Sequence, residues 1–284
     1  MSGKQKEIAH RKSFLDRFRL SGKVALITGG SRGIGRNIAL GLAEAGADIV
    51  LAARKLPDLE TTAHEITKMG RKTLAVSANV RHLPELDDLV KKAVAEFDHI
   101  DILVNNAATN PVYGSAFDIN EKVWDVTMGL NLKACFFLSQ ALGKVMRERG
   151  GGSIINVSSE DGVRPFAGLG VYSISKAGVI MLTKVLAQEW GQYNIRVNAI
   201  APAFVRTRFS QAIIENPKMI MEVKNNTALG RIAEPEEIVN AALFLASEAS
   251  SYMTGQTVVL DGGHFASVKP LLSMMAQVTK RVVD

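Results

Sequence analysis

Short apolar runs alternate with longer amphipathic stretches along most of the chain. Runs bounded by glycine or polar residues predict strands, and stretches with helical spacing of apolar residues predict helices. Because parallel strands need a long crossover connection, usually a helix, this alternation predicts an α/β fold with one Rossmann-type, doubly wound parallel sheet and helices on both faces. The predicted strands cover residues 24–27, 48–53, 73–76, 102–104, 153–157 and 195–200, and the predicted helices cover residues 37–45, 59–69, 86–97, 123–149, 172–190 and 235–245.

Residues 21–263 form a single predicted domain, because no linker, repeat or change of composition divides them. Within it, residues 204–234 have mixed polarity and contain Pro217, which predicts a lid over a pocket. Residues 1–20 form a basic N-terminal arm. Residues 264–284 have apolar side chains at helical spacing and predict an amphipathic tail, which either packs on its own subunit or crosses to a partner subunit and closes its pocket.

A glycine-rich turn, Thr28 to Gly35, follows the first predicted strand and opens the first predicted helix. Glycine lets the backbone turn sharply and approach a ligand closely, while the N–H groups and positive dipole end of a helix start favour a pyrophosphate. The spacing is Gly-x-x-x-Gly-x-Gly, which differs from the common Gly-x-Gly-x-x-Gly fingerprint. We interpret the segment as a nucleotide-binding turn, and a turn needed only for packing is the alternative.

The end of the second predicted strand bears on the choice between NAD and NADP. Proteins that bind NAD usually carry an acidic residue there, which contacts the ribose 2′-hydroxyl. This chain has Ala53 and then Arg54, so no carboxylate repels a 2′-phosphate, and Arg54 and Arg32 offer it positive charge. The sequence predicts a preference for NADP(H), with ordinary surface arginines as the alternative.

Tyr172 and Lys176 are four residues apart at the start of a predicted helix, so both lie on one helix face. A tyrosine with its ordinary pKa of about 10 exchanges protons poorly at neutral pH, and a nearby ammonium lowers that pKa by favouring the phenolate. Ser159 follows a predicted strand, at the sheet edge where doubly wound folds bind ligands. Asn131 lies in a predicted helix, where a buried amide needs partners. Each residue also has a purely structural interpretation. The Tyr-x-x-x-Lys spacing occurs by chance, Ser159 caps a turn, or Asn131 binds only the backbone.

In combination these motifs resemble the short-chain dehydrogenase/reductase family, over nearly the whole chain from about Leu20 to Gly263. In chain order they are Thr28-Gly29-x-x-x-Gly33-x-Gly35, Asn105-Asn106-Ala107, Asn131, Ser159, Tyr172-x-x-x-Lys176, Asn198, Pro202 and Thr207. So many motifs in the family's order make chance agreement remote. Three positions depart from the family pattern, because Asn79 stands where the family usually has Asp, and Ala108 and Ala203 stand where it usually has Gly.

The resemblance implies a role for each matching residue. Tyr172 is expected to be the general acid/base, and Ser159 to hold the substrate oxygen. Lys176 is expected to bind the nicotinamide ribose and to lower the pKa of the tyrosine, and Asn131 to support a proton-relay water. The residues predicted to bind the cofactor, from the residues themselves and from the resemblance, are Gly29, Ser31, Arg32, Gly33, Ile34, Gly35, Arg54, Asn79, Val80, Asn105, Ala107, Tyr172, Lys176, Pro202, Val205 and Thr207.

The predicted activity is reversible hydride transfer between a nicotinamide and a carbonyl or secondary-alcohol carbon, with no metal required. Arginines that an acidic substrate could contact, beside Ser159 and Tyr172, are Arg164, Arg206 and Arg208. The chain looks most like members acting on sugar acids, such as gluconate 5-dehydrogenases, and 3-oxoacyl-carrier-protein reductases are the alternative. A non-catalytic nucleotide-binding regulatory protein is the alternative of another class. The family also implies a homotetramer or homodimer.

Composition and charge restrict the binding partners and the cellular location that the sequence predicts. The chain has 34 Lys and Arg against 28 Asp and Glu, a net charge of +6. Most of this charge falls between Met1 and Lys23, so the domain is nearly neutral and no nucleic-acid partner is expected. The single cysteine, Cys135, fits a reducing compartment. With no secretory signal and no apolar run of about 18 residues, the sequence predicts a cytoplasmic protein with no membrane partner.

Overall fold

A computed structural model describes residues 13–266 of the chain. The arm up to residue 12 and the predicted tail from residue 267 onward lie outside the described residues. The described part forms one parallel sheet in the strand order β3-β2-β1-β4-β5-β6-β7. The strands are β1 (Val24–Thr28), β2 (Asp48–Ala53), β3 (Thr73–Ser77), β4 (Ile102–Asn105), β5 (Gly152–Val157), β6 (Ile195–Pro202) and β7 (Thr257–Leu260).

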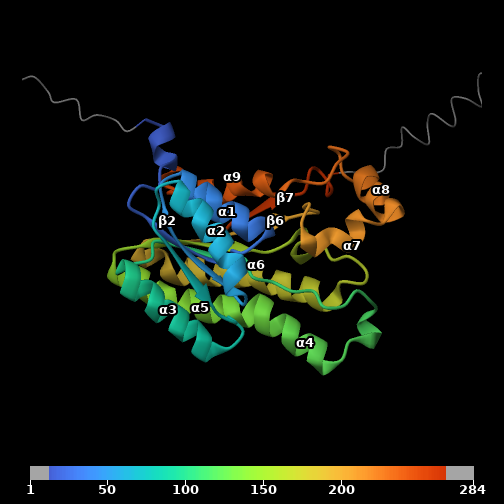
Figure 1. Cartoon of the computed structure of the whole chain (residues 1–284). Coiled ribbons are helices and arrows are strands. Elements are labelled where there is room, and N and C mark those ends of the chain that lie inside the picture. Colours follow the sequence, from blue (N-terminus) through green and yellow to red (C-terminus); the bar gives the residue numbers. More distant parts are fainter. Residues whose placement is uncertain (1–12, 267–284) are drawn as a thin grey trace, which may run out of the picture.

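Helices cover both faces of the sheet, and the two layers are visible in Figure 1. The helices are α1 (Gly33–Glu44), α2 (Leu56–Lys68), α3 (Leu83–Phe97), α4 (Glu121–Met128), α5 (Ala134–Glu148), α6 (Gly170–Trp190), α7 (Gln211–Ile214), α8 (Pro217–Asn226) and α9 (Pro235–Ala246). One hydrophobic core lies under α1, α2 and α9, and a second lies under α3, α5 and α6. The doubly wound sheet that the alternation predicts is therefore confirmed.

Three differences from the sequence prediction have physical causes. The long helix predicted over residues 123–149 is divided, because a π-helical turn η3 (Gly129–Lys133) separates α4 from α5. Strand β7 was not predicted, because its four residues follow a polar stretch and are only partly buried. The region predicted as a lid holds α7 and α8, and Pro217 begins α8 at a position where its missing N–H costs nothing.

Helix α6 is the longest described helix and packs on the sheet mainly against β6 and β5. Together with the short turn η5 (Gly191–Tyr193), α6 forms the segment Gly170–Tyr193, which is long and apolar enough to cross a membrane by length and composition alone. Just over half of its most apolar window, 56%, is buried inside the fold. Its apolar character is therefore explained by packing: Val179 and Leu186 belong to the core that α6 shares with α3 and α5.

Candidate active site

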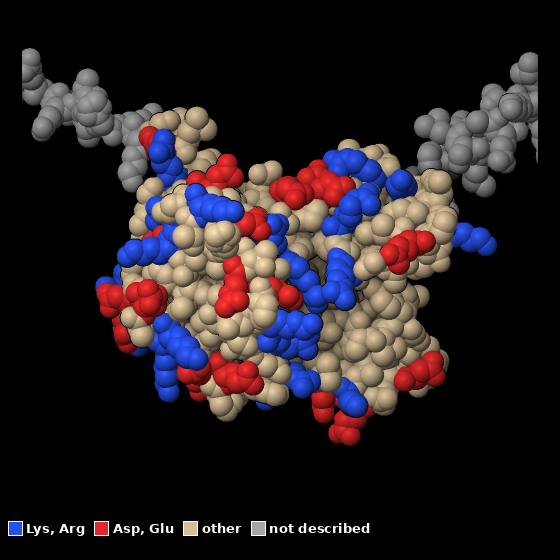
Figure 2. Space-filling view, in the orientation of Figure 1, with Lys and Arg blue, Asp and Glu red and all other residues tan. Residues whose placement is uncertain are grey.

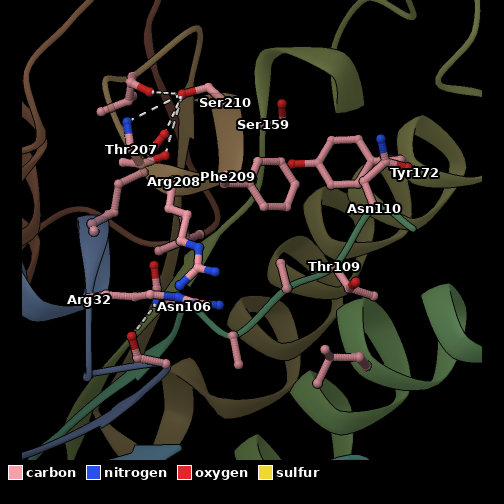
Figure 3. A pocket seen from close by; sticks show the side chains of 18 of the residues that line it. Arg32, Asn106, Thr109, Asn110, Ser159, Tyr172, Thr207, Arg208, Phe209 and Ser210 are labelled. Carbon is pink, nitrogen blue, oxygen red and sulfur yellow. Dashed lines mark hydrogen bonds between the residues drawn. The ribbon is translucent and has the colours of Figure 1, made fainter. Parts of the chain in front are cut away.

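A cleft of about 630 Å³ opens at the carboxyl ends of the central strands. The strand order changes direction between β1 and β4, and doubly wound sheets bind ligands at such a switch point. The segments that follow β1, β2, β4, β5 and β6 all contribute lining residues. Figure 3 shows side chains from these segments converging on the cleft, with Arg32 and Asn106 at one end and Ser159 and Tyr172 at the other.

The glycine turn after β1 leaves no room for side chains. A Cβ on Gly29, whose φ is +68°, would lie 2.7 Å from Nδ2 of Asn106, and a Cβ on Gly35 would overlap the same amide. No side chain caps the start of α1 among the described residues, and its first turn has no acidic residue. The helix N–H groups therefore face the cleft without a competing anion, as a bound phosphate requires.

Residues after β6 close the other side of the phosphate turn. Thr207 packs on Gly33. A Cβ added to Gly33 would lie only 3.4 Å from the methyl group of Thr207. Arg208 comes next, and its guanidinium points toward Arg32 and Asn106 (Figure 3). Arg208 was predicted to contact an acidic substrate, but its side chain is directed to the phosphate end of the cleft. The reason is its position directly after Thr207, which is held against the turn.

The part of the cleft that lies above β2 and β3, referred to below as the far end, is basic. Arg54 and Lys55 follow β2 and line it, together with Arg81 beyond β3. Figure 2 shows Lys and Arg side chains gathered around the hollow at the centre of this face. Ala53 at the end of β2 brings no carboxylate, and the acid that does line this end is Asp58, in the first turn of α2. The cradle of glycines, the open helix start and the basic wall together fit a dinucleotide. In the part of the cleft that follows β4, Nδ2 of Asn110 is buried without a partner among the described residues, so it is available to a polar group of a ligand.

Tyr172 and Lys176 lie in the first turns of α6, and Ser159 follows β5. All three line the cleft. Lys176 is 3% exposed and donates from Nζ to the carbonyl of Val157 at 2.7 Å, and Nζ lies 5.7 Å from the centre of the Tyr172 ring. The helix spacing and the strand end thus bring together the three residues that the sequence predicted as neighbours.

Burial controls the proton affinities of this group. It raises the pKa of Tyr172 well above its ordinary value, an effect that Asp161 strengthens and the hydrogen bond with Ser159 opposes. Burial also lowers the pKa of Lys176 to about 8. The sequence predicted that Lys176 lowers the pKa of the tyrosine, and the structure does not show this lowering. The cause is that desolvation of the hydroxyl outweighs the ammonium, which is turned toward Val157.

Two acidic residues that sequence reasoning missed lie directly after Ser159. Asp161 lines the cleft and accepts a hydrogen bond from Oγ of Ser159 to Oδ2 at 2.9 Å. Glu160 is 2% exposed, and its Oε2 lies 2.9 Å from Nδ1 of His264. Burial, together with the smaller effect of the neighbouring carboxylates of Asp161 and Asp261, raises the pKa of Glu160 to about 8. The adjacent acidic pair in the sequence was the signal available for this feature.

Asn131 lies in the π-helical turn η3 and does not line the cleft. Its Oδ1 accepts from the Thr109 N–H at 2.8 Å, and its Nδ2 donates to the Thr109 carbonyl at 2.9 Å and to Oγ of Ser175 at 3.0 Å. Ser175 in turn donates to the Tyr172 carbonyl at 2.7 Å. Asn131 therefore ties the segment after β4 to the turn of α6 that carries Tyr172, and the relay water stays a prediction.

Asn105 was predicted near the adenosine ribose and instead points into the core. It is 3% exposed, and its Nδ2 donates to Oγ of Ser139 and to Oδ1 of Asn156, both at 2.9 Å. The next residue, Asn106, lines the cleft and binds Thr28 through its backbone N–H and its side chain. Successive residues of a strand point to opposite faces, so the second asparagine of the Asn-Asn-Ala motif reaches the ligand side.

The remaining predicted residues divide between the cleft and its surroundings. Arg164 and Arg206 do not line the cleft, and Arg206 instead forms an ion pair with Glu234 at 2.9 Å. Gly35 lies beneath the turn rather than on the cleft wall. No group of three or more His, Cys, Asp or Glu able to hold a metal occurs in residues 13–266. The predicted residues that do line the cleft are Gly29, Ser31, Arg32, Gly33, Ile34, Arg54, Asn79, Val80, Ala107, Ser159, Tyr172, Lys176, Pro202, Val205, Thr207 and Arg208.

Known proteins match nearly the full length of the chain. Residues 29–264 match the family model described as enoyl-(acyl carrier protein) reductase. The 2-dehydro-3-deoxy-D-gluconate 5-dehydrogenase of Escherichia coli is 40% identical over 257 residues, covering 89% of this chain and 99% of that protein. Dehydrogenase/reductase SDR family member 4 of Bos taurus is 41% identical over 247 residues, covering 86% of this chain and 88% of that protein.

A solved structure agrees with these relatives. The gluconate 5-dehydrogenase of Burkholderia cenocepacia, in complex with NADP and tartrate, has a TM-score of 0.87 and 35% identity, and the match covers 90% of this chain and 100% of that one. With the parallel sheet, the glycine cradle and the Ser-Tyr-Lys cluster, these matches lead to one assignment. The chain belongs to the short-chain dehydrogenase/reductase family and is an NAD(P)-dependent oxidoreductase acting on a secondary alcohol.

Proposed function

We propose that the protein interconverts a secondary alcohol and a ketone on a sugar acid, with NADP(H) as its preferred cofactor. The observation that carries this proposal is the convergence of Ser159, Tyr172 and Lys176 at one end of a cleft whose other end is glycine-lined and basic. The nucleotide and the alcohol therefore each have suitable binding groups, and both sets of groups line one continuous cleft.

Each of the three residues has a distinct role in this proposal. Ser159 holds the reacting oxygen of the substrate, and Tyr172 takes the proton from the alcohol or returns it to the ketone oxygen. Lys176, fixed by its bond to the Val157 carbonyl, binds ribose hydroxyls and supplies positive charge beside the tyrosine. When bound, the nicotinamide ring accepts or supplies the hydride. Because burial raises the pKa of Tyr172, the tyrosine depends on such nearby positive charge to release its proton at neutral pH.

The phosphate end of the cleft has its own division of labour. The backbone of the glycine turn and the open start of α1 bind the pyrophosphate. Arg32 and Arg208 reach the same part of the cleft from different segments of the chain (Figure 3), where they neutralise the charge of the pyrophosphate. Arg54 and Lys55 lie at the far end, where they suit the 2′-phosphate of NADP. That gluconate 5-dehydrogenase was solved with NADP supports this preference.

The sugar-acid substrate is supported by the relatives and by the polarity of the cleft. Two of the similar proteins are dehydrogenases of gluconate or of a deoxygluconate. The substrate end of the cleft carries hydrogen-bonding groups at Asn110, Tyr113 and Asp161, which suit a molecule with several hydroxyls. Phe204 and Phe209, from the region predicted as a lid, give this end an apolar wall.

A substrate screen tests the proposal. Purified enzyme is assayed for NADPH oxidation with 5-ketogluconate and with a β-ketoacyl thioester, and for NADP reduction with gluconate, each repeated with the NAD form. We expect turnover of the gluconate pair and a higher kcat/KM with NADP(H). Turnover of the thioester alone would replace the sugar acid with the acyl-chain alternative.

We also propose that the chain forms a homotetramer or homodimer through α5 and α6. Apolar side chains that are large and exposed cluster on these helices, including Phe136 on α5 and Ile174, Met181 and Val185 on α6. Faces of this kind mark protein interfaces. Light scattering of the purified chain measures the assembly, and replacing Met181 and Val185 with lysine is expected to yield monomers. A cytoplasmic location remains part of this proposal, and imaging of the tagged chain tests it.

A further inference from the structure

Asp161 lines the cleft and is hydrogen-bonded to Ser159, the residue proposed to hold the reacting oxygen. Its Oδ2 accepts the hydrogen bond from Oγ of Ser159 at 2.9 Å, and its own backbone N–H donates back to that Oγ at 3.2 Å. The short turn η4 (Glu160–Gly162), which begins after Ser159, creates this reciprocal pair. The carboxylate is therefore held in one orientation beside the serine rather than swinging free in solvent.

The same carboxylate faces the tyrosine. Asp161 and Tyr172 both line the cleft, and the charge of Asp161 is the largest electrostatic influence on the tyrosine hydroxyl after burial. Only one carboxylate oxygen of Asp161 has a hydrogen-bond partner among residues 13–266, and that partner is Ser159. The second oxygen remains available to a ligand that fills the cleft.

We propose that Asp161 is a specificity-determining residue that accepts a hydrogen bond from a hydroxyl on the carbon next to the reacting carbon. The enzyme then selects α-hydroxy ketones and vicinal diols over ketones and alcohols that lack this hydroxyl. The inference rests on the proposed roles of Ser159 and Tyr172 and refines the proposed substrate class from a sugar acid to one with a vicinal hydroxyl at the reaction site.

The geometry selects the neighbouring carbon. In an α-hydroxy ketone the two oxygens are separated by about one hydrogen-bond length, which is also the separation of Ser159 Oγ and Asp161 Oδ2. When the Ser159 hydroxyl turns from Oδ2 of Asp161 and donates to the reacting oxygen, that carboxylate oxygen loses its donor. A vicinal hydroxyl of the substrate then lies within reach of the same oxygen and replaces the donor. More distant hydroxyls reach past the carboxylate toward Asn110 and Tyr113.

The energetics favour discrimination. A ketone without the vicinal hydroxyl removes water from the carboxylate and leaves it without a replacement partner, and sites built to bind a hydroxyl reject such analogues strongly. A carboxylate on the same carbon is also rejected, because two like charges at contact repel each other. The carboxylate of a sugar acid must therefore lie away from the reacting carbon.

A matched pair of ketones, 2-hydroxycyclohexanone and cyclohexanone, tests the inference with saturating NADPH. The measured quantity is the ratio of their kcat/KM values in the wild-type enzyme and in Asp161→Ala and Asp161→Asn. We expect the wild type to favour the hydroxy ketone, and Asp161→Ala to lower the ratio by about tenfold or more, mainly by raising KM for the hydroxy ketone. Asp161→Asn keeps the shape and one acceptor oxygen, so its ratio is expected to lie between the two.

Asp58→Asn is the matched control, because it removes one negative charge from the opposite end of the same cleft. It is expected to leave the ratio unchanged. If either ketone reacts too slowly to time, their inhibition constants against the fastest ketone of the substrate screen replace the rates. A purely structural role for Asp161 would slow both ketones equally, and an unchanged ratio in Asp161→Ala overturns the inference. Failure of gluconate in the screen, with the ratio still dependent on Asp161, would reject the sugar acid and leave the inference standing.

Discussion

The ammonium of Lys176 lies 5.7 Å from the centre of the Tyr172 ring, and its hydrogen bond goes to the Val157 carbonyl rather than to the tyrosine hydroxyl. The last residue of strand β5 therefore fixes the position of the lysine side chain. A contact within the protein, the hydrogen bond to Val157, therefore holds the ammonium near the tyrosine. Its burial has a cost, since it lowers the pKa of Lys176 from 10.5 to about 8.

That cost predicts a more stable but inactive Lys176→Met variant. Below pH 8 the folded protein holds a charged lysine in a desolvated place, and the difference between 10.5 and about 8 corresponds to about 3 kcal/mol. Loss of the bond to Val157 offsets about 1 kcal/mol of the gain. We expect the variant to be more stable by about 2 kcal/mol at pH 7, measured by urea unfolding.

The pH dependence of this gain has a defined sign. Between about pH 8 and pH 10.5 the unfolded lysine holds a proton that the folded lysine has lost, so the wild type gains stability with rising pH. The advantage of Lys176→Met should therefore shrink across this range, and above it the variant should be less stable than the wild type by about 1 kcal/mol, the contribution of the lost bond to Val157. Lys184→Met, at an exposed position on the same helix, serves as the control and should show no such change. An advantage that stays constant from pH 7 to pH 11 would contradict this account of the burial.

Removal of the tyrosine hydroxyl separates chemistry from binding. Tyr172→Phe keeps the ring against Phe209, whose centre lies 6.0 Å away, and deletes the group that moves the proton. We expect kcat to fall by about 100-fold or more, while the dissociation constant for NADPH, followed by its fluorescence, changes little. Near-normal turnover in this variant would remove Tyr172 from the proposed chemistry.

The end of β2 is expected to set the cofactor preference. Ala53→Asp introduces a carboxylate where the basic wall of Arg54 and Lys55 begins. Repulsion of the 2′-phosphate should raise KM for NADPH by about tenfold and leave KM for NADH unchanged or lower. Steady-state kinetics with both cofactors measure the effect, and Ala53→Ser is the uncharged control. If the preference between the two cofactors does not move, the 2′-phosphate binds elsewhere.

Arg206 and Arg208 provide an internal comparison. Arg208 points to the phosphate turn, while Arg206 pairs with Glu234 away from the cleft. We expect Arg208→Ala to raise KM for NADPH about tenfold, because a charge-assisted contact to phosphate is lost, and to leave KM for the alcohol nearly unchanged. Arg206→Ala should alter neither. A rise in the alcohol KM alone would restore Arg208 to the substrate side, as the sequence predicted.

The fold was largely predictable because its signals are periodic and local. The buried strands of a parallel sheet are continuous apolar runs, as in Val24–Thr28, and each is followed by an amphipathic helix. The elements that escaped prediction lack these signals. Strand β7 lies at the sheet edge and is only partly buried, and the π turn at Asn131 differs from its helical flanks only in its hydrogen bonding.

The candidate site was less predictable where the direction of a side chain decides the outcome. Asn105 and Asn106 are adjacent, yet one enters the core and the other the cleft. Arg208 faces the cofactor end because Thr207 packs on Gly33, a contact between segments far apart in the sequence. The acidic role of Asp161 depends on a turn only three residues long, which apolar periodicity does not report.

The amides inside the sheet have a consequence for how the fold is chosen. Asn105 on β4 bonds to Asn156 on β5, Asn156 donates to Thr183 on α6 at 2.9 Å, and Asn105 also reaches Ser139 on α5. In strands that are apolar on both faces the side chains distinguish one register from another only weakly, whereas a slip of one residue here would leave these buried amides without partners. These hydrogen bonds therefore fix the register of β4 with β5. The two strands end at the same level, so that the residues that follow them meet above the sheet.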